Sequence, residues 1–203
     1  MAKIKICGLM REQDIDAVNT NLPDYIGFVF ARSKRQIDVK KAKALKDCLN
    51  PSIKTVGVFV NEEINNIIKL CNTKVIDLIQ LHGDENEDYI RKLKDYVPNK
   101  IIKAVRVRDQ EDIKKAMKFS CDYLLLDTYQ RGEYGGTGKA FDWSVIPEIS
   151  KPYFLAGGIN SGNIEQAVKQ CNPYCIDVSS GVETNGYKDP EKIKEIVAKV
   201  KQI

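Results

Sequence analysis

Two side chains in this sequence are of the types that move protons: a thiol near the amino terminus and a carboxylate in the middle of the chain. Cys7 ends a short apolar run that begins at Ile4, and Asp127 directly follows the leucines at 124–126. Parallel sheets place reactive groups at the carboxyl ends of their strands, facing a pocket. Cys7 and Asp127 are therefore candidates for one site. The alternatives are a buried apolar filler for Cys7 and a helix cap or salt-bridged loop residue for Asp127.

A thiol and a carboxyl group on opposite sides of a substrate form a general base and a general acid. Desolvation at the end of an apolar strand favours the protonated form of a carboxyl, which suits Asp127 to the acid role. Cys7 is then the base, although an ordinary thiol with a pKa of about 8.5 is only slightly ionised at neutral pH. We therefore expect groups near Cys7 that stabilise its thiolate.

Two glycine-containing turns late in the chain predict a phosphate-binding site. They span residues 156–160 (AGGIN) and 177–182 (DVSSGV). Glycine lets backbone amides approach an oxyanion, and barrels commonly bind phosphate with the loops after their seventh and eighth strands. A plain turn is the alternative for either segment alone. The predicted phosphate ligands are Gly157, Gly158, Ser179, Ser180 and Gly181.

A third glycine-rich segment follows Asp127. Gly132 is succeeded by the run GGTG at 135–138. Such flexible composition beside a candidate catalytic residue is typical of a loop that closes over substrate, with a long surface loop as the alternative.

These residues need a frame that brings them together, and the periodicity of the chain supplies one. Short apolar runs alternate with amphipathic stretches of helical period. The runs span 4–7, 25–30, 55–60, 78–82, 101–105, 123–127, 153–156 and 174–178. Eight such units without a linker predict an α/β fold, a minimal single-domain (β/α)8 TIM barrel over residues 1–203, with an open sheet as the alternative. Ser161 predicts the N-cap of one helix, and Asp189 before Pro190 that of the last.

The composition narrows the classes of partner. Hydrophobic residues make up 43% and charged residues 30% of the chain, with a formal net charge of +4, as in ordinary globular proteins. Lysines alternate with acidic residues, so no nucleic-acid partner is expected. Without a signal peptide or a long apolar run, we expect a cytoplasmic protein that does not contact membranes. The six cysteines lack metal-binding spacing and are expected to be reduced thiols without a metal.

Seven segments of the chain resemble the phosphoribosylanthranilate isomerase family of tryptophan biosynthesis. They are KICGL (5–9), GFVFARSKRQI (27–37), QLHGDE (80–85), LLLDT (124–128), YGGTGKAFDW (134–143), LAGGI (155–159) and DVSSGVE (177–183). The resemblance implies an Amadori rearrangement of N-(5'-phosphoribosyl)anthranilate without cofactor or metal. It implies that Cys7 takes the C2 proton and that Asp127 protonates the ring oxygen.

The resemblance also implies substrate contacts. Arg35 is similar to the family's partner for the anthranilate carboxylate, a task suited to a planar guanidinium; a solvated arginine is the alternative. Gln80 is expected to orient other groups, and Asp177 to bind substrate. His82, the only histidine, resembles a position near the active site; it receives no proton-transfer role, and a structural histidine is the alternative.

Other interpretations make different demands on the chain. The related aminoaldose isomerase of histidine biosynthesis or a pentose-phosphate epimerase would have a carboxylate or a set of histidines where this chain has Cys7 and one histidine. A non-catalytic phosphate-binding barrel would keep the glycine turns without needing both Cys7 and Asp127. For the oligomeric state, a monomer is the default and a homodimer the alternative.

Overall fold

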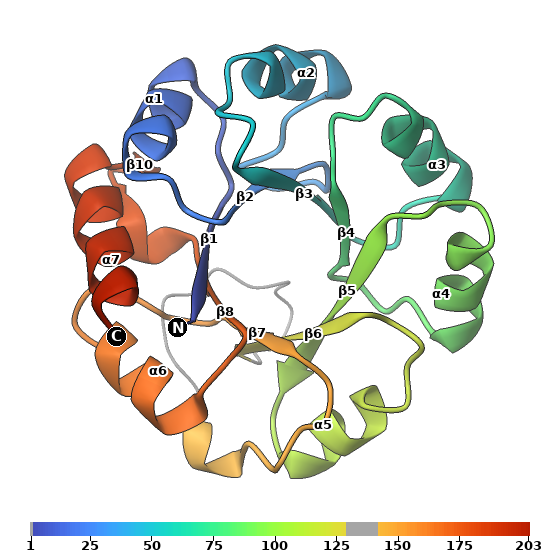
Figure 1. Ribbon diagram of the computed structural model, residues 1–203. Helices are drawn as coiled ribbons and strands as arrows, with labels where there is room; N and C mark the ends of the chain where they lie inside the picture. Colours follow the sequence, from blue (N-terminus) through green and yellow to red (C-terminus); the bar gives the residue numbers. More distant parts are fainter. Residues whose placement is uncertain (1, 129–141) are drawn as a thin grey trace.

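The chain folds into a closed barrel of eight parallel strands. The structure, a computed structural model, describes residues 2–128 and 142–203. Each strand pairs with the next, and β8 pairs back with β1, so the sheet closes (Figure 1). The strands are β1 (Lys3–Cys7), β2 (Tyr25–Val29), β3 (Lys54–Phe59), β4 (Leu78–Leu81), β5 (Lys100–Val107), β6 (Tyr123–Thr128), β7 (Tyr153–Leu155) and β8 (Cys175–Val178). Closure confirms the predicted barrel, and the alternative of an open sheet is wrong.

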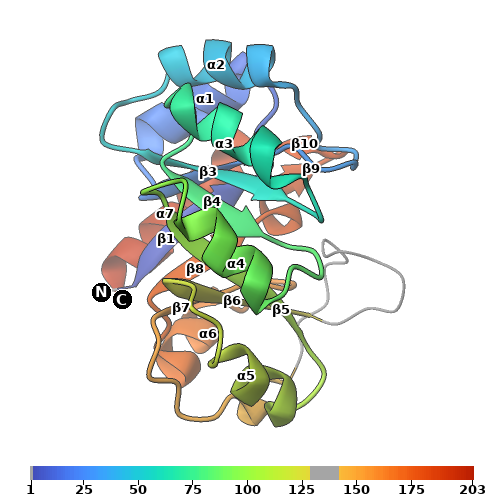
Figure 2. The same cartoon turned by 90° about the vertical axis from the view of Figure 1, so that its right-hand side faces the viewer.

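Helices form a ring around the strands (Figure 1). They are α1 (Glu12–Asn21), α2 (Val39–Asp47), α3 (Ile64–Asn72), α4 (Glu87–Lys94), α5 (Gln110–Ala116), α6 (Ile164–Cys171) and α7 (Pro190–Gln202). Between β6 and β7 the described residues contain only the short 3₁₀ helix η1 (Trp143–Val145). After β8, the 3₁₀ helix η2 (Ser180–Val182) and the small hairpin of β9 (Glu183–Thr184) and β10 (Tyr187–Lys188) precede α7. Figure 2 shows this hairpin at the end of the barrel opposite the two chain termini.

One of the two predicted helix caps is correct. The Asp189 side chain accepts hydrogen bonds from the first amides of α7, and Pro190 opens that helix. The prediction for Ser161 is wrong, because α6 has Asn163 as its N-cap residue. Residues 160–163 form a turn in which the Asn163 side chain accepts a hydrogen bond from the Asn160 amide and the Asn160 side chain accepts one from the Gly162 amide. The Ser161 hydroxyl instead donates to Glu195 on α7.

The alternation of side chains along each strand separates two cores. Residues of one parity, such as Ile4 and Ile6 on β1, pack outward in the large apolar cluster shared with the helices. The alternate residues of each strand, such as Lys5 and Cys7 on β1, point into the barrel. Near the amino ends of the strands this interior is filled by a second apolar cluster that includes Tyr25, Tyr123 and Phe154. The polar residues that follow on the same inward faces surround a cavity at the opposite end.

Candidate active site

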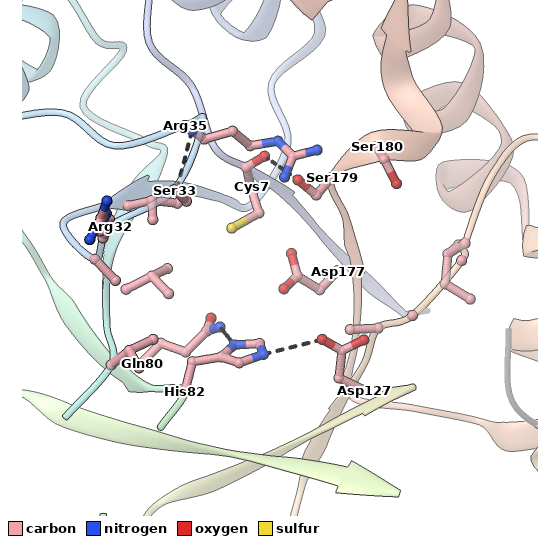
Figure 3. Close-up of a pocket in the computed structure, with 18 residues that line it drawn as sticks. Cys7, Arg32, Ser33, Arg35, Gln80, His82, Asp127, Asp177, Ser179 and Ser180 are labelled. Atoms are coloured by element: carbon pink, nitrogen blue, oxygen red, sulfur yellow. Dashed lines mark hydrogen bonds and ion pairs between the residues drawn. The ribbon is translucent and has the colours of Figure 1, made fainter. Parts of the chain in front are cut away.

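A cavity of about 370 Å³ lies at the carboxyl ends of the barrel strands. It brings together residues from nearly the whole length of the chain, as expected for the catalytic end of such a barrel. Ten of the predicted site residues line it: Cys7, Arg35, Gln80, His82, Asp127, Gly157, Gly158, Asp177, Ser179 and Ser180. Figure 3 shows the Cys7 sulfur, the Asp177 carboxylate and the Gln80, His82 and Asp127 side chains turned toward the same space.

Gly181 is the one predicted phosphate ligand that is not among the cavity-lining residues. It lies in η2, and a Cβ atom there would come within 2.0 Å of the Ile159 carbonyl oxygen. The residue therefore lets the loop after β8 approach the loop after β7. Its contribution within this structure is to the packing of the two loops against each other.

Cys7 ends β1 beside a glycine that makes room for its sulfur. Cys7 pairs with Gly27 on β2, and a Cβ at Gly27 would lie 2.6 Å from the Cys7 Sγ. The Cys7 carbonyl oxygen accepts a hydrogen bond of 3.1 Å from the Ser179 hydroxyl, which ties β1 to the loop after β8. Burial raises the pKa of the Cys7 thiol, the Lys5 ammonium partly lowers it, and the Asp177 carboxylate raises it. The expected thiolate-stabilising group is thus present, although burial outweighs it.

Lys5 is a functional candidate that sequence reasoning missed. It is fully buried, and its Nζ donates to Asp177 Oδ2 at 2.8 Å and to Gln80 Oε1 at 3.0 Å. Burial lowers the pKa of Lys5, but Asp177 and Cys7 together more than offset this, so that the pKa is raised overall and the lysine is charged. The signal available in the sequence was its position two residues before Cys7, which puts both side chains on the same face of a strand.

Gln80 and His82 connect Lys5 to Asp127. Because Lys5 only donates, the Gln80 oxygen faces it and the Gln80 Nε2 donates to His82 Nδ1 at 2.7 Å. His82 therefore carries its proton on Nε2, which donates to Asp127 Oδ2 at 3.2 Å (Figure 3). The other Asp127 oxygen accepts the Thr128 amide at 2.8 Å. His82 thus belongs to the site, as a fixed hydrogen-bond donor.

Asp177 lines the cavity with one carboxylate oxygen bonded and the other without a partner among the described residues. Its Oδ2 pairs with Lys5 at 2.8 Å, whereas its Oδ1 is buried and has no hydrogen-bond partner within the described residues. A buried carboxylate oxygen without a partner is costly unless a ligand supplies the missing donor. The position of Asp177 on the cavity wall makes a substrate hydroxyl a fitting donor.

Arg35 is held by two hydrogen bonds to one carboxylate. Its Nε donates to Glu183 Oε1 at 2.7 Å and its Nη2 to Glu183 Oε2 at 2.9 Å, and the guanidinium is largely buried. Lys188 also pairs with Glu183 Oε1 at 2.8 Å. Burial raises the pKa of Glu183, but hydrogen bonds from Arg35 and the charge of Lys188 have the larger combined effect. The pKa is lowered overall, to about 2. Arg35 is therefore not a solvated arginine, and Glu183 and Lys188 are partners that the sequence did not reveal.

The two predicted phosphate turns form one wall of the cavity. Gly157 and Gly158 both adopt left-handed backbone conformations, with φ of +83° and +67°, which glycine adopts without strain. A Cβ at Gly157 would also lie within 3.0 Å of Asp127 Oδ1. Ser179 and Ser180, at the start of η2, line the same cavity as these glycines. The glycine-rich segment 132–138, predicted to close over substrate, lies outside the described residues.

Three further observations concern residues 2–128 and 142–203. This part of the chain holds no group of three or more His, Cys, Asp or Glu side chains arranged to bind a metal ion. All six cysteines fall within it and are free thiols. None of its helices combines the length and the apolar character needed to cross a bilayer.

Comparison with known proteins associates this arrangement with one family. The family model of N-(5'phosphoribosyl)anthranilate (PRA) isomerase matches residues 4–199. A curated N-(5'-phosphoribosyl)anthranilate isomerase from Endomicrobium trichonymphae is 54% identical over 197 residues, covering 97% of each chain.

Solved structures agree with the sequence relatives. A phosphoribosyl anthranilate isomerase in complex with reduced 1-(o-carboxyphenylamino)-1-deoxyribulose 5-phosphate has a TM-score of 0.83 at 32% identity, covering 100% of both chains. Monomers of the dimeric enzyme from Thermotoga maritima have a TM-score of 0.84 at 33% identity, again covering 100% of both chains.

Proposed function

This chain belongs to the N-(5'-phosphoribosyl)anthranilate isomerase family, and on that premise we propose that Cys7 and Asp127 are the proton-transfer groups of its reaction. The reaction, a step of tryptophan biosynthesis, is the Amadori rearrangement of N-(5'-phosphoribosyl)anthranilate to 1-(2-carboxyphenylamino)-1-deoxyribulose 5-phosphate. It is an intramolecular oxidation and reduction, because C2 of the sugar is oxidised while C1 is reduced.

The observation that carries the proposal is the position of the Cys7 thiol and the Asp127 carboxyl group on different walls of a single cavity. Asp127 gives a proton to the ring oxygen, which opens the furanose and forms a Schiff base at C1. Cys7, as the thiolate, then removes the C2 proton to form the enol, which tautomerises to the ketose. His82 does not compete for the acid's proton, because its Nδ1 accepts from Gln80 and its Nε2 donates to Asp127.

Arg35 is proposed to bind the anthranilate carboxylate. Glu183 occupies the Nε and Nη2 edge of the guanidinium, so the Nη1 side is the one offered to substrate. A guanidinium fixed along one edge loses little freedom when it binds a carboxylate along another. Glu183 is therefore a positioning residue for Arg35.

The remaining contacts are proposed to hold the sugar phosphate. Gly157 and Gly158 on one loop and Ser179 and Ser180 on the next offer backbone and hydroxyl donors to the phosphate. Asp177 Oδ1, which lacks a partner among the described residues, accepts from a ribose hydroxyl. Binding the phosphate and the anthranilate at separate points positions the reacting carbons between Cys7 and Asp127.

The test generates phosphoribosylanthranilate in place and follows the loss of its fluorescence after the protein is added. Cys7→Ala is expected to lower kcat by about 100-fold or more, while affinity for the reduced product analogue stays within a few-fold. For the wild type, kcat/KM should rise with pH above neutrality, because burial raises the pKa of the Cys7 thiol. A large loss of affinity with unchanged turnover would reject the assignment and favour a phosphate-binding barrel without catalysis.

We further propose that residues 1–203 act as one barrel domain, which the pairing of β1 with β8 supports. We propose that this domain works in the cytoplasm, where its six thiols stay reduced. We also propose that it is a monomer and that it binds neither nucleic acid nor membranes. The Thermotoga maritima relative is dimeric, so a homodimer is the alternative. Light scattering on a sizing column separates the two states.

A further inference from the structure

The interior of the barrel holds a charged residue to which the proposed mechanism has assigned no part. Lys5 has a relative exposure of 0% and lies on β1, two positions before Cys7 and on the same inward face. A buried ammonium is unfavourable unless it is paired and hydrogen-bonded. Lys5 is paired with Asp177 at 2.8 Å and bonded to Gln80 at 3.0 Å, and both of these partners line the cavity.

Lys5 acts first on Cys7. The groups whose charges act on the Cys7 thiol are Lys5 on its own strand, Asp177 on β8 and Lys188 on β10, and Arg35 also interacts with the thiolate. Lys188 and Arg35 share the single carboxylate of Glu183. The Lys5 charge is the strongest of these influences in favour of the thiolate.

Lys5 acts second on Asp127, through two intermediates. An ammonium has hydrogens to donate and no lone pair, so the Gln80 oxygen must face it. The Gln80 amide hydrogens then face His82 Nδ1, and the remaining imidazole proton lies on Nε2, toward Asp127. A change at Lys5 removes the group that fixes the orientation of the Gln80 amide, and with it one end of this order of donors and acceptors.

We propose that Lys5 is the positioning residue common to both proton-transfer groups: its charge stabilises the Cys7 thiolate, and its hydrogen bond to Gln80 orients His82 against Asp127. The inference rests on the proposed function for its catalytic consequence only. Its two structural consequences, the reactivity of Cys7 and the tautomer of His82, are measurable without any assay of turnover.

The first experiment compares Lys5→Met with the wild type. Alkylation of Cys7 by iodoacetamide, followed across pH by mass spectrometry of the Cys7 peptide, should slow about tenfold at neutral pH, equivalent to about one unit in the pKa of the thiol. kcat should fall by about tenfold or more, while KM stays within about threefold, because Lys5 does not line the cavity and touches the substrate-binding Asp177 only at Oδ2. Unchanged alkylation together with unchanged kcat overturns the proposal.

Lys103→Met is the matched control. Lys103 is also a buried strand lysine with a carboxylate partner, Glu85, at 2.8 Å. It lies on β5 and does not line the catalytic cavity. Loss of this ion pair should destabilise the fold while leaving Cys7 alkylation and kcat per folded molecule near wild-type values. Equal losses of Cys7 reactivity in the two variants overturn the specific role of Lys5.

The second experiment does not depend on the folding of any Lys5 variant. His82 is the only histidine, so a long-range ¹H–¹⁵N NMR spectrum of the labelled wild type reports one imidazole. At pH 8 it should show the proton on Nε2, and Gln80→Leu should weaken this preference, lower kcat and leave Cys7 alkylation unchanged. A proton on Nδ1 in the wild type overturns the proposed link to Asp127. Should Cys7→Ala retain full turnover, the proposed function fails while these two readouts still decide the part played by Lys5.

Discussion

The two ends of the barrel interior are built from the same strands and differ in almost every chemical respect. At the amino ends of the strands, Phe154 packs against the rings of Tyr25 and Tyr123, with centroids 5.6 Å apart in both pairs. At the carboxyl ends, buried ion pairs such as Lys5–Asp177 and Arg35–Glu183 and a chain of polar hydrogen bonds surround a cavity. On β6 the change occurs along one inward face, from Tyr123 through Leu125 to Asp127. Stability and chemistry are thus assigned to opposite ends of each strand.

The difference has an energetic basis. Aromatic rings bury much apolar surface, and each well-placed pair adds about 0.5–1.5 kcal/mol. The polar end is stabilised only as far as its partners are satisfied, and Asp177 Oδ1 has no partner within the described residues. We therefore expect substitutions at the carboxyl end to change activity more than stability, and those at the amino end to do the reverse.

The largest effect is expected from Asp127→Asn at the polar end. Loss of the acidic proton should lower kcat by about 100- to 10,000-fold, because the amide keeps the shape of the side chain but cannot protonate the ring oxygen. The thermal unfolding midpoint should stay near that of the wild type. Fluorescence-based kinetics and a melting curve measure the two quantities, and a variant that retains turnover would remove Asp127 from the mechanism.

Phe154→Ala makes the converse test at the apolar end. Phe154 is fully buried among the tyrosine rings, so its truncation should lower the free energy of unfolding by about 3–5 kcal/mol. Denaturant titration measures that loss. Below the transition, kcat per folded molecule should be nearly unchanged; a parallel collapse of kcat would show that the two ends are coupled.

Glu183→Gln tests two effects of Glu183 at the polar end: the positioning of Arg35 for substrate binding and the stability supplied by the ion pair. With Arg35 less firmly held, KM should rise by about tenfold, the effect of weakening one charge-assisted bond, with little change in kcat. The pKa of Glu183 is lowered from 4.5 to about 2, so its stabilising contribution is fully present above pH 4.5 and is lost as the pH falls toward 2. Acid titrations of the wild type and the variant should therefore converge at low pH; parallel curves would contradict the ion-pair explanation.

The smallest effect is expected from Tyr25→Phe. This change removes the hydrogen bond between the Tyr25 and Tyr174 hydroxyls, 3.0 Å apart, and leaves the ring in place. The free energy of unfolding should fall by about 0.5–1.5 kcal/mol without any change in kcat or KM. A measurable change in the kinetics would show that the amino end is not purely structural.

Local regularities were readable in the sequence because they arise from neighbouring residues. The alternating runs and helical stretches predicted the eight strands, and Asp189 before Pro190 predicted the start of α7. Helix caps that depend on turn geometry were harder to predict from the sequence. The turn at 160–163 makes Asn163, and not Ser161, the N-cap residue of α6. Between β6 and β7, the described residues after position 141 contain the short 3₁₀ helix η1, which was not predicted from the sequence.

The candidate site also contains residues that the sequence predicted and residues that it did not. Residue type and position at strand ends were enough to select Cys7 and Asp127, and glycine content was enough to select the two turns that face them. Lys5 and Glu183 escaped notice because a lone charged residue in a sequence is most often solvent-exposed.

By itself, then, the sequence determined the succession of strands and helices and the residues able to move a proton, since both follow from local pattern and side-chain chemistry. Only the tertiary structure decided which charges are buried together. Lys5 meets Gln80 and Asp177 across 75 and 172 positions of the chain, and Glu183 meets Arg35 across 148. Those pairings exist because closure of the barrel brings the ends of β1, β4 and β8 to one cavity, and no local pattern records which distant strand end will lie beside another.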